Sequence, residues 1–172
     1  MSLLWLLRHA KAAPQAEGQE DRDRPLAAKG EQAMRELGTW AARQKLAPEL
    51  VLCSSSARTR QSLALLLPSL AGRPEVMIEG GLYLADPGDL LVRLRRVPAR
   101  CGSVLVVGHN PGLHEFAVLL TRSASGPLGR RLSAGMPTGA LAGFALDGPW
   151  SALDHGAARL THYVTPKELR DA

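Results

Sequence analysis

The chain begins with Met1-Ser2-Leu3-Leu4-Trp5-Leu6-Leu7-Arg8-His9-Ala10. The apolar run over residues 3–8 predicts a short buried strand. Arg8 and His9 follow where that strand should end. A cation and a nucleophilic side chain at the carboxyl end of a strand are well placed to meet an anion. The stretch therefore predicts both the first strand of a sheet and one part of an anion site.

Two more apolar runs are followed by the same residue types. Val104-Leu105-Val106-Val107-Gly108 leads directly into His109, and the run Glu49-Leu50-Val51-Leu52-Cys53 comes shortly before Arg58. In open α/β sheets, ligands bind outside the carboxyl ends of the strands. Arg8, His9, Arg58 and His109 are therefore expected to meet at one edge of one sheet.

These four residues suit phosphoryl transfer. Two arginines can hold the oxygens of a phosphoryl group with forked hydrogen bonds. His9, as a neutral imidazole, can attack phosphorus and carry the group transiently. A protonated His109 would stabilise the negative charge of the transition state. Backbone N–H groups of a helix starting at Asn110-Pro111 would add another anion contact.

Size and composition indicate a soluble globular protein. A length of 172 residues fits a single domain over residues 1–172, and 45% of the residues are hydrophobic. The longest apolar runs are far shorter than the roughly 20 residues that span a bilayer, so no membrane segment is predicted. No basic stretch precedes the first apolar run, which predicts a cytoplasmic location. Cys53 and Cys101 have neither metal-ligand nor redox spacing and are expected to be buried thiols.

The charge of the chain bears on its partners. The formal net charge is +5, but only 4% of residues are aromatic and the basic residues are scattered. This pattern disfavours nucleic-acid binding, and an attraction to acidic or phosphorylated substrates explains the charge equally well.

Strand and helix patterns alternate, which predicts an α/β sandwich with a mostly parallel sheet. A helix is expected to follow the cap candidates Ser54-Ser55-Ser56, and Asn110 and Pro111 are expected to be the N-cap and first residue of another. Residues 12–28 and 122–139 are predicted to be loops. The other predicted elements are strands at 49–53, 75–78, 103–108, 140–146 and 159–164, and helices at 30–45 and 86–97.

Several segments together resemble a known family. Leu7-Arg8-His9-Ala10-Lys11 resembles the Arg-His-Gly signature of the histidine phosphatase superfamily, which also contains the phosphoglycerate mutases. Other segments, in the same order, are similar to its small SixA-type branch, the phosphohistidine phosphatases. They are Asp23-Arg24-Pro25-Leu26, Ser54 to Ser62, Leu82-Tyr83-Leu84-Ala85, Val107 to Leu113 and Pro137-Thr138-Gly139-Ala140. The resemblance spans nearly the whole chain.

The resemblance implies a fold and a set of roles. It implies a three-layer α/β/α sandwich with one antiparallel strand in an otherwise parallel sheet, and no metal or cofactor. His9 matches the phosphorylated nucleophile and His109 the second catalytic histidine. Arg8 and Arg58 match the phosphate clamp.

The chain departs from the family pattern at two places. Ala10 replaces the signature glycine, so the backbone there cannot need a conformation that only glycine adopts. The larger family also places an acidic proton donor after the third strand, where this chain has a short segment with Gly81 near the expected position. Glu79 and Asp86 are the remaining candidates for a donor.

A missing acid bears on the substrate. An alkoxide leaving group benefits greatly from a positioned acid, whereas the imidazole of a phosphohistidine is less basic and needs less help. The short inserts predict an open site that would admit a histidine on a protein surface. Arg130 and Arg131 are candidates for its rim, although such residues more often lie in a solvated loop. The sequence therefore favours phosphohistidine on a signalling or carrier protein.

Other functions stay open at this stage. A phosphatase for small phosphate esters, such as sugar phosphates or nucleotides, would be favoured by a working acid at Glu79 or Asp86. A mutase would need more enclosure than the short inserts provide. A non-catalytic phosphate-binding module would need the arginines but not both histidines. The sequence predicts no oligomeric state.

Overall fold

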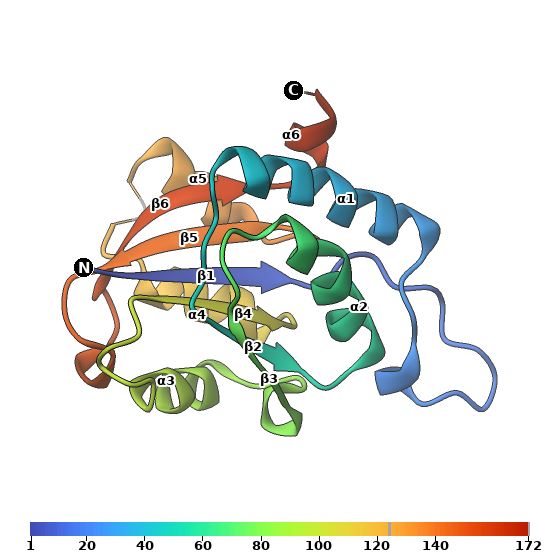
Figure 1. Ribbon diagram of the computed structural model, residues 1–172, viewed down its shortest axis with the longest axis horizontal. Coiled ribbons are helices and arrows are strands. Elements are labelled where there is room, and N and C mark those ends of the chain that lie inside the picture. Colours follow the sequence, from blue (N-terminus) through green and yellow to red (C-terminus); the bar gives the residue numbers. More distant parts are fainter. Residues whose placement is uncertain (124, 172) are drawn as a thin grey trace.

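A computed structural model describes residues 1–123 and 125–171 (Figure 1). The described residues form one six-stranded sheet in the order β3-β2-β4-β1-β5-β6. Among the strands of the described residues, only β5 runs antiparallel to its neighbours, as the family resemblance implies. The strands are β1 (Ser2–Arg8), β2 (Leu50–Ser54), β3 (Glu75–Glu79), β4 (Ser103–Gly108), β5 (Leu141–Leu146) and β6 (Ala158–Val164).

Helices cover both faces of this sheet (Figure 1). Side chains alternate between the two faces along β1: Leu4 and Leu6 pack with α3, α4 and α5, whereas Trp5 and Leu7 pack with α1 and α2. The predicted three-layer α/β/α sandwich is thus confirmed. The helices are α1 (Ala28–Arg43), α2 (Ala57–Leu66), α3 (Pro87–Arg95), α4 (Gly112–Leu120), α5 (Pro127–Ala134) and α6 (Pro166–Asp171).

The register of the central strands aligns their carboxyl ends. Arg8 of β1 is paired with Gly108 of β4, and Cys53 of β2 is paired with Val107. The residues that follow these three strands therefore leave the sheet at the same edge. Both cysteines are buried thiols, as expected.

Side chains cap two helix starts, the first of them through one of the predicted candidates. Ser56 accepts a hydrogen bond from the backbone N–H of Thr59 at the start of α2, and Asp86 accepts one from Asp89 at the start of α3. In the part of the chain that the structure describes, no helix combines the length and apolar character needed to cross a bilayer.

The prediction of an unbroken loop over residues 122–139 is wrong, because α5 lies within it. Pro127 occupies the first turn of this helix and Leu132 is buried against the core. The many Gly, Ser and Arg residues of this segment give no apolar pattern that would predict a helix. The helix depends instead on contacts of its buried side with the rest of the fold. Ala124, also in this predicted loop, lies outside the described residues.

The predicted start of α4 is also wrong. The helix begins at Gly112, not at Pro111, and the amide of Asn110 donates to the carbonyl of Met136 at 2.9 Å instead of capping the helix. A Cβ on Gly112 would lie 1.9 Å from the carbonyl oxygen of Ala85. The helix start thus packs directly on the segment after β3, a close approach that only glycine permits.

Candidate active site

The structure brings the four sequence-predicted residues together at the carboxyl edge of the sheet. His9 follows β1 and His109 follows β4, with their ring centroids 5.2 Å apart. Arg58, in the first turn of α2, lies between them. Its Nε donates to Nε2 of His9 at 3.3 Å, and its Nη2 lies 3.4 Å from Nδ1 of His109.

Hydroxyl groups fix Arg58 relative to His9. Thr59 donates its hydroxyl to the carbonyl of Ser54, which holds the start of α2 against the end of β2. Ser62 accepts a hydrogen bond from the backbone N–H of Ala10 and donates one to the carbonyl of Arg58. The helix is thereby bonded to the segment that carries His9. Ala10 is not among the described non-glycine residues with positive φ, as the replacement of the signature glycine requires.

The His9 imidazole is held in one tautomer. Its Nδ1 lies 2.7 Å from the carbonyl oxygen of Ala10, and a carbonyl only accepts, so Nδ1 carries the proton. This leaves the lone pair on Nε2, where it accepts the hydrogen bond from Nε of Arg58. Burial, assisted by the positive charges of Arg58 and Arg8, lowers the pKa of His9 to about 4. His9 is therefore neutral at pH 7.

His109 is similarly constrained. Because Arg58 can only donate, Nδ1 of His109 accepts, and Nε2 carries a proton toward the Ser54 hydroxyl at 2.7 Å. Burial, followed by the charges of His9 and Arg58, lowers the pKa of His109 to about 3. The protonated His109 expected from the sequence is therefore not the form that these surroundings favour.

Arg8 is anchored from the opposite side of the site. Its Nη1 donates to the carbonyl of Met136 at 2.9 Å. The backbone N–H of Gly139 is shared between the carbonyls of Arg8 and His9, at 3.1 and 3.0 Å. The segment from Met136 to Gly139 therefore forms one wall of the site.

Asp21 is a site residue that the sequence argument missed. Its carboxylate accepts from Arg58 and from the hydroxyl of Tyr83, and its backbone carbonyl also accepts from Arg58 at 2.8 Å. The hydrogen bonds from Tyr83, Arg24 and Arg58 hold the pKa of Asp21 well below its usual range. Asp21 is thus an anion that orients Arg58.

No feature of the sequence predicts that Asp21 binds Arg58. It lies among the charged residues of the predicted 12–28 loop, whose path over the site depends on long-range contacts. Tyr83 belongs to one of the segments that resemble the family, but the resemblance assigned no role to this residue. Its ring meets the ring of His109 edge-on, with centroids 5.3 Å apart.

The two proton-donor candidates are engaged elsewhere. The carboxylate of Glu79 is bound by Arg93 through both Nε and Nη2. Asp86 caps α3. Within residues 1–123 and 125–171, neither carboxylate hydrogen-bonds to His9 or His109, and no three His, Cys, Asp or Glu side chains gather as a metal site would require.

Comparisons with known proteins identify the family of the chain. The model of the histidine phosphatase superfamily (branch 1) matches residues 4–83. An uncharacterised protein of Mycobacterium tuberculosis strain H37Rv is 34% identical over 94% of this chain and 100% of the relative. The chain belongs to the histidine phosphatase superfamily.

Solved structures refine the assignment. A protein from Nakamurella multipartitia, described as a candidate phosphohistidine phosphatase SixA, is 31% identical with a TM-score of 0.83 over 96% of both chains. The protein histidine phosphatase SixA in complex with tungstate is 25% identical with a TM-score of 0.79, over 97% of this chain and 99% of that chain. This chain is therefore a phosphatase of the SixA-type branch.

Proposed function

We propose that this SixA-type phosphatase removes the phosphoryl group from phosphohistidine on a signalling or carrier protein, through a covalent intermediate on His9. The observation that carries the proposal is the fixed tautomer of His9. Its Nδ1 proton is held by the Ala10 carbonyl, so Nε2 carries the lone pair, which accepts from Arg58 until a phosphoryl oxygen takes over that hydrogen bond. A neutral, oriented imidazole flanked by guanidinium groups is what attack on a phosphoryl anion requires.

In the first step, Nε2 of His9 bonds to phosphorus and the bond from phosphorus to the substrate nitrogen breaks. The electron pair goes to that nitrogen. The leaving imidazole is neutral, because its other ring nitrogen takes a proton from solvent beforehand. His9 keeps its Nδ1 proton, and the Ala10 carbonyl stabilises the positive charge that develops on the ring. Arg8 and Arg58 bind the phosphoryl oxygens.

In the second step, a water oxygen bonds to phosphorus and the bond from phosphorus to Nε2 breaks. The electron pair returns to His9, and phosphate leaves with the two hydrogens of the water before it equilibrates with solvent. The negative charge of a bound phosphoryl group raises the pKa of His109. A bound phosphoryl group therefore favours the protonated form of His109, which would stabilise its negative charge.

The contacts that the nearby carboxylates make support phosphohistidine, and not an ester, as the substrate. An ester must expel an alkoxide, which needs a positioned acid. Glu79 is bound to Arg93, Asp86 caps a helix, and Asp21 is held in its charged form. The second ring nitrogen of phosphohistidine takes its proton from solvent, so this set of residues suffices without a positioned acid.

The test compares two substrates and two proteins. We expect phosphate release from a phosphohistidine-bearing protein in EDTA, and loss of about a thousandfold or more in rate for His9→Ala. p-Nitrophenyl phosphate, an ester, is assayed in parallel. Turnover of the ester alone would transfer the assignment to small phosphate esters. Phosphate binding without turnover of either substrate would indicate a binding module.

A further inference from the structure

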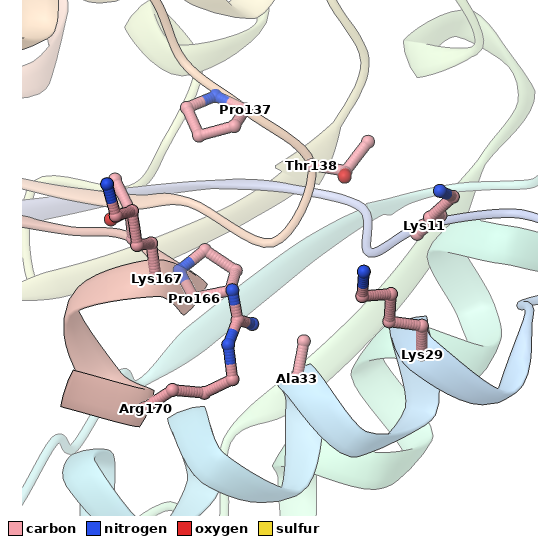
Figure 2. Close-up of a pocket in the computed structure, with 9 residues that line it drawn as sticks. Lys11, Lys29, Ala33, Pro137, Thr138, Pro166, Lys167 and Arg170 are labelled. Carbon is pink, nitrogen blue, oxygen red and sulfur yellow. The ribbon is translucent and has the colours of Figure 1, made fainter.

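A hollow of about 390 Å³ is lined by several cationic side chains, which Figure 2 shows. Four of its lining side chains are cationic and none is a carboxylate. The lining residues are Lys11, Lys29, Ala33, Pro137, Thr138, Thr165, Pro166, Lys167 and Arg170. We call this hollow the basic pocket.

Close backbone packing assembles one side of the basic pocket. The carbonyl of Lys11 accepts from Ala27, just before α1, at 2.9 Å. A Cβ on Gly30 would lie only 2.2 Å from the same carbonyl oxygen. Because glycine at position 30 permits this approach, the segment after β1 lies directly on the first turn of α1. Lys11 and Lys29 consequently line the same side of the pocket (Figure 2).

The opposite side of the basic pocket comes from α6, which carries Lys167 and Arg170 (Figure 2). A Cβ on Gly139 would lie 2.9 Å from Cγ of Pro166, so the start of α6 packs tightly on the turn before β5. Residues from three separate parts of the chain are thus held around one opening.

The basic pocket shares a wall with the catalytic site. Met136 accepts from Arg8, and Gly139 donates to the carbonyls of Arg8 and His9. Pro137 and Thr138, between them, line the basic pocket. Lys11 is also only two residues from His9 along the chain. A peptide that presents a phosphohistidine to His9 therefore passes close to the basic pocket.

The four cations are available to a ligand. All four side chains belong to exposed residues, and none pairs with a carboxylate in the described part of the chain. Arg131, which the sequence placed on the rim, differs: it donates to the carbonyl of Tyr163 and pairs with Glu168. Four unpaired cations around one hollow repel one another, and an anionic ligand would relieve that repulsion.

The character of the pocket favours carboxylates on a peptide. Three of its cations are lysines, which act as point charges, and one arginine supplies the only forked donor. A dedicated phosphate site typically has backbone N–H groups or several forked arginines. Ala33, Pro137 and Pro166 add apolar surface, which suits the methylene groups of Glu and Asp side chains.

We propose that the basic pocket binds acidic residues flanking the phosphohistidine of the protein substrate. The inference rests on the proposed function and names the substrate class: a phosphohistidine within an acidic segment. Exposed cations at the rim of a site act chiefly on the rate of encounter and make it sensitive to salt.

The hydrolysis test uses pairs of phosphohistidine peptides that differ only in Glu or Gln residues on one flank. We expect kcat/KM for the Glu peptide to exceed that for the Gln peptide by about tenfold at low salt, mainly through KM. In Lys29→Glu/Lys167→Glu/Arg170→Glu the ratio should fall to one or below. Lys11 is left intact because of its proximity to His9.

A matched control reverses three charges at the opposite edge of the sheet. Arg43→Glu/Arg73→Glu/Arg100→Glu changes exposed arginines that precede β2, β3 and β4. This variant has the same net charge as the pocket variant and should keep the preference for the Glu peptide. Equal loss of preference in both variants would overturn the proposal, since net charge alone would then explain it.

A binding measurement separates the pocket from the proposed reaction. A fluorescent Glu peptide without a phosphoryl group should bind the wild-type protein at low salt and lose about tenfold in affinity in the pocket variant. This result would support the pocket even if phosphohistidine were not hydrolysed. No difference between the two proteins would overturn it. Pocket-dependent binding of tripolyphosphate, without any for the Glu peptide, would also overturn the assignment to acidic peptides.

Discussion

The catalytic site and the basic pocket lie side by side but are built in opposite ways. His9, Arg58 and His109 are 8%, 4% and 3% exposed, and hydrogen bonds fix each side chain. The cations of the basic pocket are exposed and unpaired within the described residues. Chemistry requires reacting atoms held in a narrow range of geometry, whereas exposed charges attract a ligand over longer distances and tolerate looser placement.

Arg58→Ala should disturb the fixed geometry of the catalytic site most and cause the largest loss of activity in this group of predictions. It removes the group that contacts both histidines and leaves the Asp21 carboxylate without its buried partner. We expect kcat/KM for a phosphohistidine peptide to fall by about a thousandfold. Arg60→Ala, at an exposed position on the same helix, is the matched control. A loss below about tenfold for Arg58→Ala would contradict the central placement of Arg58.

The pH dependence should reveal how strongly the site is buried. Because the pKa of His9 is lowered to about 4, its imidazole should stay neutral at pH 5. NMR titration of the ring nitrogens measures this directly, and titration of His9 near its ordinary value would contradict it. Activity toward a substrate stable in acid should fall about tenfold per pH unit below pH 4.

The same shift makes stability depend on pH. The unfolded chain protonates its histidines near pH 6.5, whereas folded His9 protonates only near pH 4. The unfolded state therefore binds more protons between these values. The free energy of unfolding should decrease by about 1.4 kcal/mol per pH unit for His9 as the pH falls from 6.5 to 4. Urea unfolding of wild type and His9→Gln at several pH values isolates this contribution.

Asp21→Asn should have an intermediate effect. It keeps the shape of the side chain but removes its negative charge. That charge strengthens the hydrogen bonds that the carboxylate accepts from Arg58 and Tyr83. We expect about a tenfold loss of kcat/KM. The pKa of His109 should fall further, because the charge of Asp21 raises it. Asp23→Asn, an exposed neighbour, is the control; if it matched Asp21→Asn in both readouts, a specific role for Asp21 would be wrong.

Charge reversal in the basic pocket should barely alter stability. For Lys29→Glu/Lys167→Glu/Arg170→Glu we expect the free energy of unfolding to change by no more than about 1 kcal/mol, since each residue is exposed and unpaired in the described structure. Urea titrations of this variant and of Arg58→Ala, run in parallel, compare their free energies of unfolding. A large destabilisation would show that the pocket cations support the fold instead of being free for a ligand.

The smallest effects are expected at the two carboxylates that the sequence offered as proton donors. Glu79→Gln and Asp86→Asn should each leave phosphohistidine turnover within about twofold of wild type. Glu79 is committed to Arg93, and Asp86 caps a helix. Initial rates on a phosphohistidine peptide and on p-nitrophenyl phosphate test this. A strong loss on the ester would restore one of them as an acid and favour ester hydrolysis.

The order of the six strands and of helices α1 to α4, and the meeting of Arg8, His9, Arg58 and His109, follow from the sequence alone. Both follow from local patterns: apolar runs form strands, and residues after parallel strands share one edge of the sheet. The mixed sheet was also foreseen through the family resemblance.

The position of Asp21 beside Arg58, the helices α5 and α6, and the basic pocket depend on tertiary contacts. Each depends on where a loop or a short helix lies against distant residues. The close approach of Gly30 to Lys11 and of Gly139 to Pro166 has no local signature, because glycine is common in loops for other reasons. Contacts between residues far apart in sequence exist only once the sheet has brought their elements together.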